Sequence, residues 1–251
     1  AVNDAPTHVS NASSSSIKVT PTSTGQQVTR ERSYQQRRND HAFAAITEDG
    51  SVVVWGDQNF GGTLTKTSFG GYDVSDELNG NVKEIISSEF GFAALRNDGT
   101  VVSWGSGGGV VEENGSPITS VTKIFSTDKA YAALKEDGSV FTWGNAENGG
   151  DSSLVTADLQ GGVVNIFTNG HAFAALKQDG SVVTWGNEEY GGAVPSWVNS
   201  NLQDDVVSVF STGNAFAALK SDGSVHAWGD KHAGGNLNGW TSTGGMVYND
   251  L

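Results

Sequence analysis

The sequence AFAALKQDGSVVTWG occupies residues 172–186 and occurs in closely similar form four more times. The other copies lie at residues 42–56, 92–105, 130–144 and 215–229, and their Asp-Gly pairs begin at Asp49, Asp98, Asp137, Asp179 and Asp222. Successive pairs are 49, 39, 42 and 43 residues apart. This period is typical of repeat architectures, in which each unit packs on its neighbours because it is too small to bury its own apolar face.

Each copy predicts three short strands. An apolar run such as 163–167 forms the first, the Ala-Phe-Ala-Ala-Leu-Lys segment the second, and the segment ending in Trp-Gly the third. The Asp-Gly pair between the second and third strands is a strong hairpin signal, since Asp and Gly both tolerate the positive φ of tight turns. A loop follows each third strand and often contains Gly-Gly. We therefore expect an all-β fold of small antiparallel sheets.

The repeats divide the chain into an N-terminal arm and a repeat domain. We expect an extended polar and basic arm or linker over residues 1–40. The repeat domain at 41–251 is predicted to contain repeats at 41–78, 79–117, 118–159, 160–202 and 203–251. The first repeat carries Arg30–Asp40 where the others carry their apolar first strand, so its first strand is predicted to be missing.

The motif Ala-Leu-Lys-x-Asp-Gly-Ser-Val-x-x-Trp-Gly resembles the regulator of chromosome condensation repeat family, especially its short bacterial relatives such as the secreted propeller that inhibits β-lactamase. This resemblance spans residues 41–251. It implies a β-propeller with one small sheet per repeat. Members of the family usually have seven blades and this chain has motifs for five, so either five blades close a ring or the chain is part of a larger array.

Charge is distributed unevenly along the chain. The arm carries five basic and three acidic residues, and the remainder carries nine basic and 25 acidic residues. An acidic repeat domain repels phosphate backbones, so nucleic acid is not an expected partner. No apolar run is long enough for a membrane-spanning helix, so we expect no membrane insertion. Cysteine is absent, which rules out disulfides and thiol chemistry.

Topology places the recognition surface at one end of the repeats. The loop after the first strand and the exit from the third strand lie at the same end, opposite the Asp-Gly turn, and the residues at that end vary between repeats. One group of variable residues precedes the second strand: His41, Phe90, Lys129, His171 and Asn214. The other follows Trp-Gly and includes Phe60, Glu188, Glu189, Tyr190 and His232. We predict that this surface binds a protein or a glycan.

The seven tryptophans are assigned two roles. Five of them, at Trp55, Trp104, Trp143, Trp185 and Trp228, occupy the same third-strand position. Their recurrence indicates packing between sheets rather than sugar stacking. Trp197 and Trp240 lie off this position and are candidate exposed contacts.

Enzymatic function is not indicated. The histidines are scattered without metal-ligand spacing, and the sequence has neither a Gly-x-Ser-x-Gly elbow nor a phosphate-binding loop. Glu188 and Glu189 would form a glycosidase-like pair only with another carboxylate across a cleft. We therefore expect no catalytic residues, no metal and no cofactor.

Two functions follow as hypotheses. The first is a non-enzymatic extracellular or cell-surface binding and adhesion module. The missing first strand leaves a sheet edge that an arm segment such as Ile17–Thr20 would complete, within the molecule or in a neighbour. The second hypothesis is therefore a self-assembling subunit whose basic arm completes the sheet of a neighbour, giving a homo-oligomer or filament. The arm residues assigned to this role are Ile17, Val19, Arg30, Arg32, Arg37 and Arg38. In a third interpretation, Arg30–Asp40 is a linker and the first sheet simply has fewer strands than the others.

Overall fold

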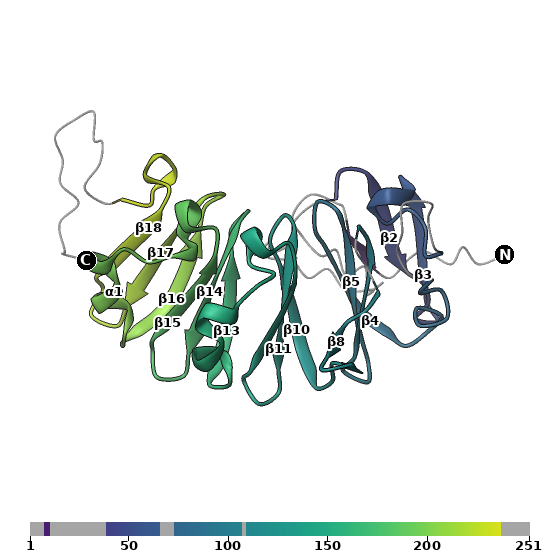
Figure 1. Ribbon diagram of the computed structural model, residues 1–251, viewed down its shortest axis with the longest axis horizontal. Coiled ribbons are helices and arrows are strands. Elements are labelled where there is room, and N and C mark those ends of the chain that lie inside the picture. Colours follow the sequence, from purple (N-terminus) through teal and green to yellow (C-terminus); the bar gives the residue numbers. More distant parts are fainter. Residues whose placement is uncertain (1–7, 11–38, 66–72, 107–108, 237–251) are drawn as a thin grey trace, which may run out of the picture. The chain divides into compact units, whose positions relative to one another are not determined.

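The computed structural model describes residues 8–10, 39–65, 73–106 and 109–236 (Figure 1). The chain divides into two compact units, Ala1–Asp128 and Lys129–Leu251. Both are mostly β, with small antiparallel sheets and short helical turns, as predicted. Among the described residues, none of the helices has the length and apolar character needed to cross a membrane.

The first unit contains the strands of repeats one and two and the first strand of repeat three. They are β1 (His8–Ser10), β2 (Ala42–Ile46), β3 (Val52–Gly56), β4 (Val82–Ser87), β5 (Gly91–Arg96), β6 (Val101–Gly105), β7 (Gly109–Val110), β8 (Glu112–Glu113), β9 (Ser116–Pro117) and β10 (Val121–Ser126). The 3-10 helix η1 (Gln58–Phe60) follows β3. β7 adds a fourth strand to the sheet of repeat two.

The second unit contains the remaining strands, and β13 to β18 form two three-stranded sheets within it. The strands are β11 (Ala130–Lys135), β12 (Val140–Gly144), β13 (Val163–Thr168), β14 (Ala172–Lys177), β15 (Val182–Gly186), β16 (Val206–Ser211), β17 (Ala215–Lys220) and β18 (Val225–Gly229). Short helical segments join them: η2 (Ala146–Asn148), η3 (Ser153–Leu159), η4 (Glu188–Gly192), α1 (Ser196–Asn199), η5 (Ser200–Leu202) and η6 (Lys231–Ala233).

The Asp-Gly turns join the second and third strands as predicted, but only the glycine takes a positive φ. In repeat four Gly180 has φ +80°, and its N–H donates to the carbonyl of Lys177 at 3.0 Å. The Asp179 carboxylate instead accepts bonds from the Ser181 hydroxyl (2.6 Å) and N–H (3.0 Å), and these bonds lower the pKa of Asp179. The predicted hairpin is therefore present, and the Asp contributes to it by hydrogen-bonding the turn with its side chain rather than by adopting positive φ.

The place beside β2 that corresponds to a first strand is occupied by β1. The two strands pair antiparallel, with Val9 opposite Ala45. The predicted candidate for this place was Ile17–Thr20, whereas the structure uses residues 8–10 of the same chain. Ile17, Val19 and the four arginines of the arm lie outside the described residues. A neighbour's arm could pair with β2 only by displacing β1. Assembly through the arm therefore stays a prediction.

Repeat boundaries within each unit share one construction. The third-strand tryptophan and second-strand phenylalanine of a repeat form a stacked aromatic pair, which contacts the Gly-Gly loop of the preceding repeat. Trp104, Trp185 and Trp228 donate their indole N–H to the carbonyls of Gly61, Gly149 and Gly191 at 3.1, 3.0 and 3.1 Å. A Cβ on these glycines would lie 2.7, 2.5 and 2.8 Å from the phenylalanine ring of the next repeat. The aromatic pair thus fits only against a loop without a side chain.

These contacts form the apolar core of each unit. In the first unit, Ile46 and Val52 of repeat one pack with Phe92 and Trp104 of repeat two. In the second, Leu176 and Val182 of repeat four pack with Phe216 and Trp228 of repeat five, together with linker residues Val198 and Leu202. The small alanines of the second strands are buried in the same clusters and let the sheets approach. Packing between sheets, as predicted for the tryptophans, is confirmed for Trp104, Trp185 and Trp228.

Trp55 departs from this pattern. It stacks on Phe43 with ring centroids 5.2 Å apart, yet its side chain is 47% exposed. Among the described residues no repeat precedes repeat one, so no Gly-Gly loop covers this aromatic pair. The prediction of a packed tryptophan is therefore wrong for Trp55.

Glu84 on β4 supplies a test of the first unit's packing. Burial raises the pKa of this half-buried carboxyl, and the nearby Lys123 and Lys83 only partly oppose the change. A raised pKa means that the ionised form is less favourable in the folded protein, so Glu84 lowers stability at pH values above that pKa. We expect Glu84→Gln to raise Tm by a few degrees at pH 7, with the difference vanishing in acid. Thermal melts against the exposed Glu48→Gln control check this, and an unchanged or lower Tm at pH 7 would contradict it.

Candidate binding surface

The variable loops of each repeat lie at the end predicted for them. In all five described repeats, the residue after Trp-Gly donates its backbone N–H to the carbonyl of the variable residue before the second strand. The pairs are Asp57 to His41, Ser106 to Phe90, Asn145 to Lys129, Asn187 to His171 and Asp230 to Asn214, at 2.9–3.0 Å. The two groups of variable residues are therefore brought together in every repeat.

Repeat four holds an aromatic pair of its own at this end. The His171 and Tyr190 rings lie 4.4 Å apart, and Asn148 Nδ2 lies 3.1 Å from His171 Nδ1. Buried Asn169 fixes both loops: its amide donates to the Tyr190 carbonyl at 2.6 Å, and its oxygen accepts from the His171 and Ala172 N–H groups at 2.8 Å. A buried amide that bonds both loops holds the rings in a fixed position.

Repeat one repeats this arrangement with Phe60 in place of Tyr190. His41 stacks on Phe60 at 4.0 Å, Phe90 of repeat two lies 5.6 Å beyond, and Asn39 donates to the Phe60 carbonyl at 2.7 Å. Phe60 also packs against the core of the first unit, so it is only half-exposed. The positioning asparagines were not predicted, although the shared pattern Asn-x-His-Ala-Phe at residues 39–43 and 169–173 signals them.

The remaining predicted residues are dispersed. Lys129 and His232 are exposed and Asn214 is half-buried, each in the loop of its own repeat. Trp197 on α1 is 58% exposed, as expected of a linker tryptophan, and Trp240 lies outside the described residues. Glu188 and Glu189 are exposed at the start of η4, where the Asn187 side chain accepts from the Glu189 N–H at 3.0 Å.

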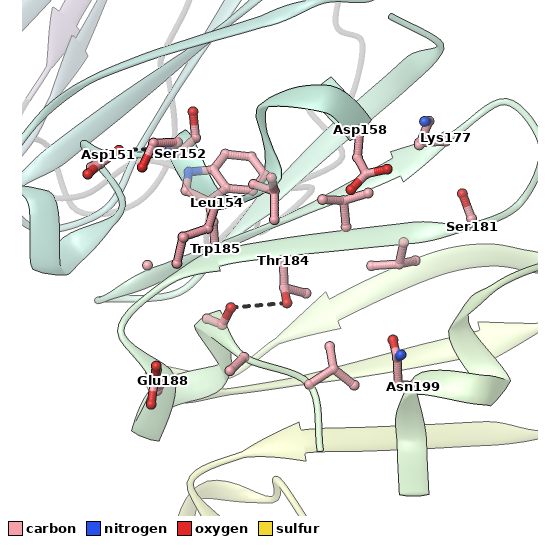
Figure 2. Close-up of a pocket in the computed structure, with 18 of the residues that line it drawn as sticks. Asp151, Ser152, Leu154, Asp158, Lys177, Ser181, Thr184, Trp185, Glu188 and Asn199 are labelled. Carbon is pink, nitrogen blue, oxygen red and sulfur yellow. Dashed lines mark hydrogen bonds between the residues drawn. The ribbon is translucent and has the colours of Figure 1, made fainter. Parts of the chain in front are cut away.

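A groove that was not predicted begins beside these glutamates. It has a volume of about 760 Å³ and lies along β15, between η3 and the segment 192–203. Figure 2 shows Asp151 and Glu188 toward one end, Asp158 and Lys177 toward the other, and Trp185 and Leu154 between them. Its lining residues are spread over positions 146–203, so no single short motif indicates it. Glu147, Glu188 and Glu189 line a shallower hollow at its mouth.

The acidic character of this region follows from its residues. The groove lining includes the carboxylates of Glu147, Asp151, Asp158 and Glu188 against the single cation Lys177. Thr184 on the groove floor donates to the Gly192 carbonyl at 3.2 Å and fixes that wall to β15. A groove lined by both apolar side chains and carboxylates suits a ligand that has both apolar and basic groups.

In the part of the chain that the structure describes, the His, Asp and Glu side chains include no group of three or more placed to hold a metal ion. His226 on β18 has Ser224 Oγ 3.4 Å from its Nε2, and burial lowers the pKa of its imidazole.

No protein-family model matches the sequence, and no curated protein matches it. Solved structures similar to this chain include human WBSCR16 (20% identity, TM-score 0.49) and Prp20p from Saccharomyces cerevisiae (18%, 0.46). They also include the CRINKLY WD40 ectodomain of the Arabidopsis thaliana receptor kinase ACR4 (18%, 0.47). The matches cover 76, 77 and 76% of this chain and 60, 56 and 66% of the respective structures. The chain thus spans less than two thirds of the length of each.

Proposed function

We propose that the chain is a non-enzymatic protein-binding module that uses the variable-loop end of its second unit. The observation that carries this proposal is the His171–Tyr190 pair, which buried Asn169 holds in place beside three exposed carboxylates and the mouth of a groove. Rigid aromatic groups lose little conformational entropy on binding and are frequent at interface hot spots. The acidic surroundings favour a basic protein segment over an acidic glycan.

The binding test starts from a ligand selection. We expect a displayed random-peptide library to yield peptides rich in Lys or Arg with an aromatic residue, whereas a glycan array run in parallel should give no comparable ligand. Calorimetry with a selected peptide should show at least about tenfold weaker binding for Tyr190→Ala. The same assay should show weaker binding with reduced salt dependence for Glu188→Gln/Glu189→Gln.

The control is Glu136→Gln, an exposed charge change at the opposite, Asp-Gly end, which should leave binding unchanged. Thermal melts should give the same Tm for all these variants, because the substituted side chains are exposed or half-exposed. Selection of acidic peptides, capture of glycans alone, or wild-type affinity in Tyr190→Ala would contradict the proposal.

The proposal also covers the arrangement of the repeat sheets and the location of the protein. We take the repeat sheets as blades of a β-propeller type, supported by the resemblance of the repeat motif and by the contact with a Gly-Gly loop that recurs for three of the aromatic pairs. An extracellular or cell-surface location is part of this proposal. Protease treatment of intact producing cells should remove the protein, and complete protection until the cells are lysed would contradict that location.

A further inference from the structure

Within the part of the chain that the structure describes, two apolar sheet faces are uncovered at the ends of the repeat series. The leading face belongs to repeat one and consists of Phe43, Val53 and Trp55, which are 41, 45 and 47% exposed. The trailing face belongs to repeat five and consists of Phe210, Leu219 and Val225; Phe210 is 59% and Val225 41% exposed. Single exposed apolar residues are ordinary, but two clustered faces of this kind require an explanation.

These faces are the two halves of the boundary that the repeats form with one another. Phe92, Val102 and Trp104 are the counterparts of the leading face in repeat two, and all three are buried against repeat one. Phe167, Leu176 and Val182 are the counterparts of the trailing face in repeat four, where they pack against repeat five. The internal boundaries thus show what each face accepts.

The trailing face includes a Gly-Gly loop already in its receiving conformation. Gly234 has φ +100°, and the Gly235 N–H donates to the Asp230 carbonyl at 2.8 Å, as Gly192 does to Asn187 at 2.7 Å. A Cβ on Gly191 would meet the Phe216 ring at 2.8 Å, whereas a Cβ on Gly234 would meet nothing within 4 Å. The Gly234 loop therefore has the conformation that receives an aromatic pair at the internal boundaries, although no aromatic pair of the described residues contacts it.

We propose that the Phe43–Trp55 pair of one copy docks on the Gly234 loop and trailing face of a second copy, so that copies associate head to tail. The occupant is inferred from continuity with the internal boundaries, where a stacked Phe-Trp pair contacts this type of loop three times. Because the two faces differ, the contact is heterologous, and a pair of bound copies leaves one leading face and one trailing face available for further copies.

Salt dependence separates this contact from assembly through the basic arm. Each copy carries a formal charge of −14, so copies repel one another at low ionic strength. Association through apolar faces should strengthen as salt screens this repulsion, whereas association of a basic arm with an acidic body should weaken.

The test uses two complementary variants in the full chain. Phe43→Ala/Trp55→Ala removes the leading face and Phe210→Ala/Val225→Ala removes the trailing face. Light scattering of the wild-type protein should show a mass that rises above 26.1 kDa with concentration. Each variant alone should associate at least about tenfold more weakly, and an equimolar mixture should form one-to-one dimers through the one intact pair of faces.

Each alternative outcome overturns the proposal. A wild-type mass that stays at one chain at every concentration would show that the faces are satisfied within the molecule. If one variant by itself still associates as the wild type does, the contact joins two like faces. If association becomes weaker as salt is added, the basic arm holds the copies together. Tyr190→Ala, at the proposed binding surface, should associate as the wild type does, so the two proposals fail separately.

Discussion

Replacing Trp228 by alanine is expected to lower the free energy of unfolding of the second unit by about 3–5 kcal/mol, and its Tm by roughly 10 °C. The side chain is fully buried, stacks on Phe216 at 5.4 Å and donates to the Gly191 carbonyl. Its loss leaves a cavity between repeats four and five and a carbonyl without its partner. Urea unfolding followed by circular dichroism measures the change.

Trp55→Ala is the matched control, since Trp55 occupies the same strand position but is 47% exposed. Its removal empties no cavity and breaks no hydrogen bond described in the structure. We expect a change below about 1 kcal/mol under conditions where the protein is monomeric. Equal losses for the two variants would show that the buried contact with the preceding repeat is not the source of stability.

Gly191→Ala should also be strongly destabilising, for two separable reasons. Gly191 has φ +100°, which is strained for any residue with a Cβ. In addition, its Cβ would lie 2.8 Å from the buried Phe216 ring, which cannot move without disturbing the core. Backbone strain of about 1–2 kcal/mol adds to overpacking of about 1–3 kcal/mol, so urea unfolding should show a total loss of several kcal/mol.

Gly234→Ala isolates the first of these terms. Gly234 has the same φ of +100° but open space where the Cβ would be. Under conditions where the protein is monomeric, backbone strain alone should therefore lower the stability of this variant. The difference between the two variants measures the cost of the steric clash alone. If Gly234→Ala were as harmful as Gly191→Ala, the contact between loop and ring would not account for the conserved geometry of the repeat boundaries.

Much of the fold could be predicted because its signals are local. The Asp-Gly turn and the strands flanking it are specified within about 15 residues, and the match between repeats reinforces the assignment. The burial of Trp185 and Trp228 follows from their recurrence at one position. Local signals also explain why burial was wrongly predicted for Trp55. Its neighbours in sequence are those of a buried residue, but its exposure depends on whether a preceding repeat covers it.

What the sequence did not predict depends on segments that meet through space. β1 lies about 30 residues from the strand that it pairs with, and its three residues carry no distinctive pattern. The groove beside β15 needs η3, the third strand and the following linker together. Asn169 is an ordinary loop residue in sequence, yet in the structure it bonds two loops at once. The direction of the variable loops could be deduced from topology, but the shape of the surface that they form could not.

Repeats two, four and five are each fixed to their predecessor at two places. One is the Gly-Gly loop, and the other is the Asp-Gly turn, whose glycine carbonyl accepts the N–H of the next repeat's first valine, as Gly50 accepts from Val82 at 3.0 Å and Gly180 from Val206 at 3.0 Å. The segment between these points runs over 20 positions from Gly62 to Val82 but only 14 from Gly192 to Val206. The same attachment therefore forms whether the connecting chain is long or short. These connections are natural places to insert foreign sequence, because an added loop would leave both attachment points in register.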